Sequence, residues 1–209
     1  MKRLSIVFVV LFLSTAALTQ MADASFTIGG SFVSDLKQST PPVNTSFVNT
    51  VNFDHHLMLE GAVSFRMLNA HVVSLYLEVP AAGIPSQTLT GAPQISNVSG
   101  FVARMSSLFV TPGFKLKVLP TAPISPWASV GAGWARYSLV DFPGTVNKGA
   151  LQYGGGLDFK TGLPLLGFRV EVRDFVTTDP SSLLGPTFTP QSGLHHHNLL
   201  VGGGVVLRF

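Results

Sequence analysis

The sequence predicts an all-β protein, an eight-stranded antiparallel up-and-down transmembrane β-barrel that follows a cleaved secretory signal. Three observations predict it: apolar and polar residues alternate with a period of two, long and short connections alternate strictly, and charged residues are scarce. Only 11% of the residues are charged, against roughly 25% in an average soluble domain. So few charges cannot cover a soluble surface, whereas 46% apolar residues can bury enough surface to exclude disorder.

Residues 1–24 are predicted to be a signal peptide. Two basic residues near the start precede an unbroken apolar stretch from Ile6 to Leu13, and Ala22 and Ala24 supply the small residues that signal peptidase accepts. The apolar stretch is shorter than the about 20 residues that a membrane helix needs. We expect cleavage after Ala24, which leaves 25–209 as the barrel domain.

Eight segments carry the strand pattern. The clearest runs from Phe168 to Arg173, where apolar and charged residues alternate as they never do in an amphipathic helix. The segments predicted to be strands are 26–33, 57–66, 73–79, 110–118, 127–137, 151–159, 168–173 and 199–209.

Connections of two lengths join these strands. The short ones are 67–70, 119–126 and 160–164, and the long ones, mostly polar or rich in proline, are 34–54, 80–107, 140–148 and 176–197. Alternate hairpins of an up-and-down barrel emerge at opposite ends, so all the long loops share one rim. Long extracellular loops and short periplasmic turns are typical of bacterial outer-membrane barrels.

The charged residues of the strands share one face, which we predict to line the lumen. A soluble barrel would carry its apolar face inside, but ten charges are too few to solvate the outside of such a barrel. Buried without a partner, each would cost several kcal/mol, about what removing one member of a buried pair costs, so we expect a paired network. Its predicted members are Glu60, Arg66, Glu78, Lys115, Lys117, Asp158, Arg169, Glu171, Arg173 and Arg208.

This network has two interpretations. In the first it is a fixed plug of ion pairs, since an eight-stranded barrel is just wide enough for its side chains to fill it. In the second, pairs exchange partners and form a narrow gate for ions or water. Gly154, Gly156, Gly202 and Gly204 on the same face either leave water-filled gaps or make room for larger side chains.

The chain ends on an amphipathic strand with a terminal aromatic, Phe209, preceded at two-residue steps by Leu207 and Val205. This ending resembles the β-signal that the barrel assembly machinery reads in outer-membrane proteins. FRVEVRDF at 168–175 and SPWASVGAG at 125–133 are similar to two strands of the small OmpA transmembrane-domain, OmpX and OmpW type barrels. The resemblance implies the bacterial outer membrane as location, and its lipids and the assembly machinery as partners, but no activity.

Five histidines are expected at the rim of the long loops: His55, His56, His195, His196 and His197. The strand at 26–33 would separate the two groups by roughly 10 Å, given the ~4.8 Å spacing of strands. Imidazole binds zinc, copper and nickel, but no carboxylate spacing supports a designed site. We therefore expect solvated loop ends, without a metal or cofactor.

Aromatic residues near the strand ends predict two girdles at the membrane interfaces. Those near the turns are Trp127, Phe159, Phe168 and Phe209, and those near the long loops are Phe53, Phe109, Tyr137, Phe142 and Phe175.

The predicted function is non-enzymatic: a surface and membrane-integrity protein whose loops contact the outside. One alternative is a small passive channel for ions or small, even apolar, solutes. Another is a lipid A-modifying enzyme, which needs a nucleophile and a base; Ser107, Ser192 and the rim histidines are candidates, although their spacing resembles no known deacylase motif. The chain has no basic run that would favour nucleic acid and no cysteine for disulfides or thiolate metal sites.

Overall fold

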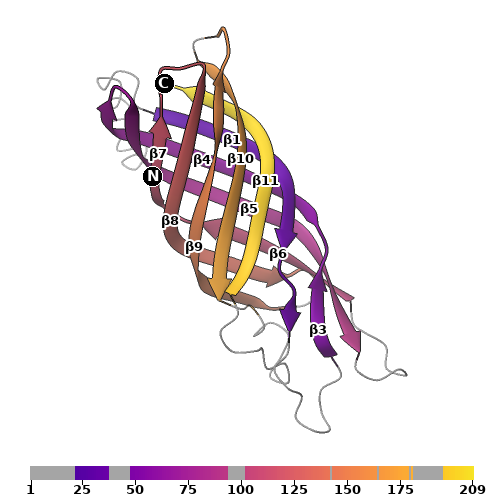
Figure 1. Cartoon of the computed structure of the whole chain (residues 1–209). Helices are drawn as coiled ribbons and strands as arrows, with labels where there is room; N and C mark the ends of the chain where they lie inside the picture. The colour runs from indigo at the N-terminus through magenta and orange to yellow at the C-terminus, as the bar shows by residue number, and fades with distance from the viewer. Residues whose placement is uncertain are drawn as a thin grey trace, which may run out of the picture.

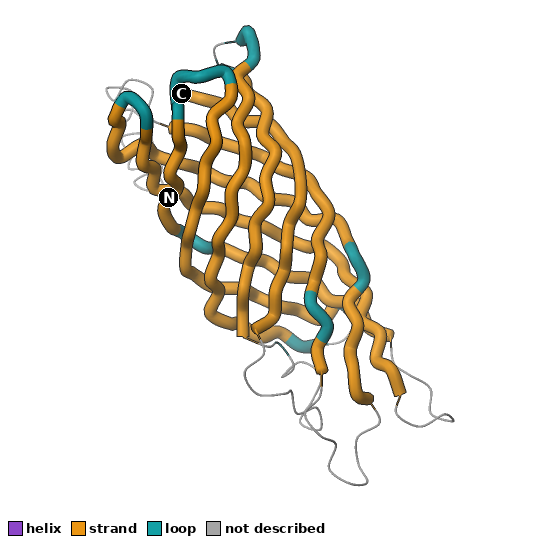
Figure 2. The backbone as a smooth tube through the Cα atoms, viewed as in Figure 1, coloured by secondary structure: helices purple, strands orange, loops and turns teal. Residues whose placement is uncertain are grey.

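The computed structural model describes residues 22–37, 48–93, 102–141, 143–163, 165–178, 180 and 195–209. These residues form one antiparallel sheet of eleven strand segments, without a helix in the described ranges (Figures 1 and 2). The segments are β1 (Ala22–Val33), β2 (Leu36–Lys37), β3 (Val48–Phe53), β4 (His56–Ala70), β5 (Val73–Pro93), β6 (Val102–Val110), β7 (Gly113–Val118), β8 (Ile124–Leu139), β9 (Thr145–Lys160), β10 (Leu166–Thr178) and β11 (His195–Arg208).

The eleven segments make eight barrel strands. Two-residue interruptions divide β1 from β2, β3 from β4, and β6 from β7, and each pair continues a single strand. For example, β6 and β7 both pair with β5 on one side and with β8 on the other, on either side of Thr111 and Pro112. The predicted eight-stranded antiparallel barrel is confirmed.

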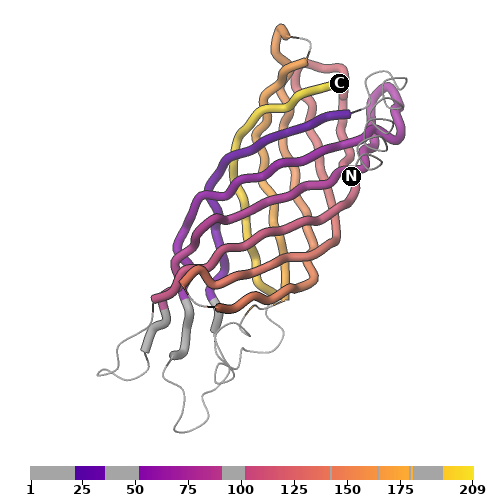
Figure 3. The backbone as a smooth tube through the Cα atoms, turned by 180° about the vertical axis from the view of Figure 1, so that it is seen from behind, coloured from indigo at the N-terminus to yellow at the C-terminus, as the bar shows by residue number. Residues whose placement is uncertain are grey.

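The barrel closes between the first and last strands. β1 pairs with β11 from Asp23↔Arg208 to Val33↔Asn198, and Ala22 and Phe209 exchange backbone hydrogen bonds at the rim. Figure 3 shows the opposite wall, where the early strands cross in front of the late ones. The turns at 71–72, at 119–123 and at 161–163 with 165 lie at the same end as Phe209, which we therefore call the periplasmic end.

Several strands extend further than the sequence predicted. β5 runs to Pro93 and β6 begins at Val102, so most of the predicted loop 80–107 is strand, and β9 begins at Thr145 within the predicted loop 140–148. The cause is pairing outside the amphipathic region: Asn52 lies opposite Thr90 where β3 meets β5. Backbone hydrogen bonds continue there although the alternation of apolar and polar residues has ended.

The outward face of the barrel is apolar. Its exposed side chains include Phe26, Ile28, Val63, Phe114, Val130, Leu151, Phe168, Val170 and Val201. Because successive residues of a strand point to opposite faces, this band follows from the alternation in the sequence, and it is the surface that lipid contact requires.

No helix in the described ranges is both long and apolar enough to cross a bilayer.

Candidate functional site: the filled lumen

The periplasmic half of the lumen holds a layer of buried ions. It contains four cations and five carboxylates, all at most 8% exposed: Lys115, Lys117, Arg169, Arg173, Asp23, Glu60, Glu78, Asp158 and Glu171. We call this set the ion layer. The strands β1, β4, β5, β7, β9 and β10 each contribute at least one member, so the charges meet only when the barrel closes.

Asp158 is the centre of the first cluster in the ion layer. Arg169 binds it with two parallel hydrogen bonds, Nε to Oδ1 at 2.8 Å and Nη2 to Oδ2 at 3.2 Å, the fork geometry that makes such pairs strong. Lys117 Nζ lies 2.7 Å from Asp158 Oδ2 and 3.1 Å from Asp23 Oδ2. The indole Nε1 of Trp127 also donates to Asp158, at 3.2 Å.

Arg173 is the centre of the second cluster. Its guanidinium lies 2.9 Å from Glu60, 3.0 Å from Glu78 and 3.2 Å from Glu171. Its side chain is fully buried. Three carboxylates therefore share one arginine. Lys115 lies 2.9 Å from Glu78, and Arg169 lies 3.9 Å from both Glu78 and Glu171.

Two aromatic rings separate and support the cations. Arg169 and Arg173 lie over the ring of Trp127, 4.7 and 4.8 Å from its centroid, within the range of cation–π attraction. Lys115 and Lys117 each lie 5.3 Å from the centroid of Tyr76. Trp127 is 4% exposed and faces the lumen, so its predicted place in the periplasmic girdle is wrong.

Of the ten predicted interior charges, eight lie in the ion layer. Arg66 and Arg208 are half-buried near the periplasmic opening, where Arg66 lies beside the Tyr76 hydroxyl. The prediction omitted Asp23 because it assigned this residue to the signal peptide. The alternation Asp23, Ser25, Thr27 on one face of β1 was the available signal.

Glycines make room for the ion layer. A Cβ atom at Gly156 would lie 2.9 Å from Trp127 Cζ2 and 3.0 Å from Glu171 Cβ, and one at Gly154 would lie 2.7 Å from Arg173 Cγ. Gly202 is crowded by Thr27 in the same way. Of the two interpretations of these glycines, the structure supports space for large neighbours over water-filled gaps.

The opposite half of the lumen is mostly apolar, although Thr177, His196 and Asn198 are also buried there. Its buried apolar side chains form one cluster, which we call the apolar layer: Val33, Phe53, Met58, Ala82, Ile84, Leu89, Met105, Phe109, Ala135, Tyr137, Ala150, Phe175 and Leu200. Phe109 stacks on Phe175 with centroids 5.1 Å apart and meets Tyr137 edge-on at 5.8 Å.

The apolar layer corrects the predicted outer girdle. Phe53, Phe109, Tyr137 and Phe175 point into the lumen instead of toward lipid, and Phe142 lies outside the described residues. The parity of the strands was the missed signal, since Phe175 shares its face with Arg173 and Glu171. The outward aromatic residues near this rim include Phe32, Trp134 and Tyr153, which are 45%, 44% and 51% exposed.

Comparison with known proteins finds the same architecture. No protein-family model and no curated protein match the chain. Among solved structures, Neisserial surface protein A matches with a TM-score of 0.54 at 7% identity, over 90% of this chain and 97% of the other. The outer membrane protein OprG from Pseudomonas aeruginosa matches with a TM-score of 0.56 at 10% identity, over 91% and 97%.

The chain has the fold of the small outer-membrane β-barrels. The location that fits this fold and its apolar outward face is the bacterial outer membrane.

The rim histidines of this outer-membrane barrel do not form one cluster in the described residues. β1 does lie between β4 and β11, as predicted, but the imidazoles of His55, His56 and His196 have separate partners. His56 Nε2 accepts from Thr88 N at 2.9 Å, the His55 ring packs on Phe32, and His196 is buried against Phe53. His196 is thus no solvated loop end. Within the described ranges no three metal-ligating side chains converge.

His197 belongs to an outward-facing trio that the sequence did not predict. Its Nδ1 lies 2.6 Å from Asp174 Oδ2, and the Tyr153 hydroxyl donates to the same oxygen at 2.8 Å. Asp174 breaks the alternation of FRVEVRDF by placing a carboxylate on the outward face, and these two neighbours keep it 7% exposed.

Ser107, one of the two serines proposed for catalysis, does not contact these histidines. Ser107 faces the lumen, is 5% exposed, and its Oγ has no hydrogen-bond partner in the described protein. Ser192, the other serine, lies outside the described residues. In the described residues Ser107 therefore has no base beside it, whereas Ser34, which the sequence analysis did not name, has its Oγ 3.5 Å from His196 Nδ1.

The predicted cleavage site lies within β1, which yields a first testable prediction. We expect the mature protein to begin at Ser25, and the intact mass of protein extracted from membranes measures this. Loss of Asp23 would leave Lys117 with Asp158, 2.7 Å away, so the ion layer would retain its main contact. A mass that includes Asp23 would contradict cleavage after Ala24.

Proposed function

We propose that this protein is a non-conducting, non-enzymatic barrel of the bacterial outer membrane, whose filled lumen serves as a rigid core and whose loop rim contacts the outside. The filling of the lumen carries this proposal. Arg169, Arg173 and Asp158 are at most 1% exposed in one half, and Phe109 and Phe175 are 0% exposed in the other. A permeating ion would have to displace paired charges and then cross an apolar layer, where desolvation is costly.

The proposal includes two partners. Outer-membrane lipids surround the apolar band, and the barrel assembly machinery recognises the last strand during insertion. Phe209, Leu207 and Val205 support the second, because they are 57%, 41% and 38% exposed on the outward face of the closing strand.

Conductance measurements test the proposal. We expect the purified protein to give no openings in planar bilayers, and Glu171→Gln to give none either, because Arg173 retains Glu60 and Glu78. A general porin inserted under the same conditions is the conducting control. Openings of the wild type would contradict the proposal in favour of a channel, and openings of the variant alone would favour the switching gate. A lost or gained acyl chain on lipid A after expression would contradict the non-enzymatic part.

A further inference from the structure

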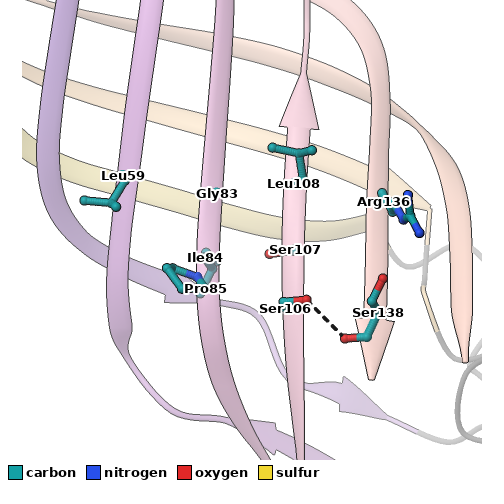
Figure 4. A pocket seen from close by; sticks show the side chains of 9 residues that line it. All are labelled: Leu59, Gly83, Ile84, Pro85, Ser106, Ser107, Leu108, Arg136 and Ser138. Atoms are coloured by element: carbon teal, nitrogen blue, oxygen red, sulfur yellow. Dashed lines mark hydrogen bonds between the residues drawn. The ribbon is translucent and has the colours of Figure 1, made fainter. Parts of the chain in front are cut away.

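A groove interrupts the outward face of the barrel between β5 and β6. The two strands lose register between Ile84, opposite Ser107, and Gln87, opposite Met105. Pro85 lies in this interval and has no N–H to donate to the ladder. A hollow of about 380 Å³ opens at this point (Figure 4).

The apolar part of the groove suits an acyl chain. Leu59, Gly83 and Leu108 line it from three neighbouring strand segments, β4, β5 and β6, and all three are on the outward face. Leu108 is 42% exposed. The groove is therefore continuous with the apolar band that contacts lipid.

Arg136 lines the polar edge of the same groove, where the apolar band ends. On β8 the outward residue before it is Trp134, 44% exposed, and the one after it is Ser138. On the adjacent β6, the outward Leu108 lies opposite Arg136, and the next outward residue, Ser106, lies opposite Ser138. Arginine and tryptophan at such a boundary are typical of the headgroup region of a membrane.

The guanidinium of Arg136 has no anionic partner in the described part of the chain. Asp141, the acid of the adjoining turn, is bound instead by Arg104, with Nη2 2.6 Å from Oδ1. That hydrogen bond lowers the pKa of Asp141, so this carboxylate stays ionised and paired. The exposed Arg136 therefore keeps its donors for an external anion, and the guanidinium fork matches phosphate oxygens.

We propose that this groove binds a phosphate-bearing lipid of the outer leaflet, with one acyl chain on Leu59, Gly83 and Leu108 and its phosphate on Arg136. The inference rests on the outer-membrane location in the proposed function and adds a specific ligand class to it. A phosphate alone would use Arg136, but not the apolar groove.

Native mass spectrometry tests the proposal. The folded full chain in tetraethylene glycol monooctyl ether is incubated with equal amounts of dipalmitoyl phosphatidic acid and dipalmitoylglycerol, which differ only in the phosphate. We expect about tenfold preferential retention of phosphatidic acid, the factor that one charge-assisted hydrogen bond contributes. Arg136→Gln should remove the preference, and Arg104→Gln, the matched control whose charge is already paired, should preserve it.

Gly83→Leu tests the acyl-chain half of the groove. A Cβ at Gly83 meets only Ser107 O at 3.6 Å and Leu108 Cδ1 at 3.9 Å, so the new Cβ needs no backbone shift, and Gly83 itself lines the groove that the rest of the side chain would occupy. We expect it to lower the retention of both lipids. Equal retention of the two lipids by the wild type, or an unchanged preference in Arg136→Gln, would overturn the proposal.

Two further readouts distinguish a lipid site from a simple anion site and from a misfolded barrel. Displacement of phosphatidic acid by millimolar inorganic phosphate would overturn the assignment to a lipid, because it would indicate a simple anion site. The heat-dependent shift in gel mobility reports whether each variant is a folded barrel. A wild type that never folds in detergent or vesicles would refute the proposed function together with this inference, whereas a folded wild type without lipid preference would refute this inference alone.

Discussion

Arg173→Gln is expected to destabilise the barrel by about 3–5 kcal/mol, the range for removing one member of a buried charge cluster. The variant leaves Glu60, Glu78 and Glu171 near one another without the guanidinium that lies within 3.2 Å of each. Lys115 compensates only Glu78, at 2.9 Å. Urea unfolding of the protein in lipid vesicles measures the loss of unfolding free energy.

Arg104→Gln is the matched control for this experiment, because it makes the same substitution in an ion pair on the surface. The Arg104 and Asp141 side chains are 55% and 33% exposed, and exposed pairs contribute only about 0–1 kcal/mol. A similar loss in the two variants would show that the ion layer has no special role in stability.

Phe109→Ala is expected to cost about 3–5 kcal/mol, since it removes a fully buried ring from a packed core. Phe109 is 0% exposed and contacts the rings of both Phe175 and Tyr137. The barrel wall holds these neighbours in place, so the cavity cannot collapse. The same urea titration measures the effect.

Phe114→Ala provides the comparison for the apolar layer. Phe114 lies in β7, which continues the strand of β6, but it is 50% exposed on the outward face. Lipid tails are as apolar as the side chain they would replace, so acyl chains can fill the space and the loss should be smaller. An equal or larger loss for Phe114→Ala would contradict the assignment of Phe109 to the lumen core.

The alternation of the strands was sufficient to predict much of this structure. It placed Arg169 and Glu171 on one face and Phe168 and Val170 on the other, and the structure has them so. The same alternation could have predicted the apolar layer, because Phe175 lies two residues after Arg173 and so shares its inward face. The sequence analysis misassigned it by grouping aromatic residues according to their distance from the loops instead of their parity.

Strand ends were predicted less well, because alternation marks only the part of a strand that has two different environments. Beyond the membrane the outward face of β5 is polar and its inward face mixes Gln87 with Leu89, so the stretch from Gln87 to Thr90 has no long regular alternation that distinguishes strand from loop. Pairing with β3 and β6 decides it.

The sequence by itself determined the class of fold and the face of the charged residues in the regular strands, because a period of two persists where the two faces of a strand meet different environments. Only the tertiary structure decided which residues became partners. Arg173 and Glu78 are distant in the chain, and closure of the barrel brings them to 3.0 Å. The break between Ile84 and Gln87 and the Arg136 beside it likewise become one groove only when β5, β6 and β8 lie side by side, since period-two order contains no information on which strands are neighbours.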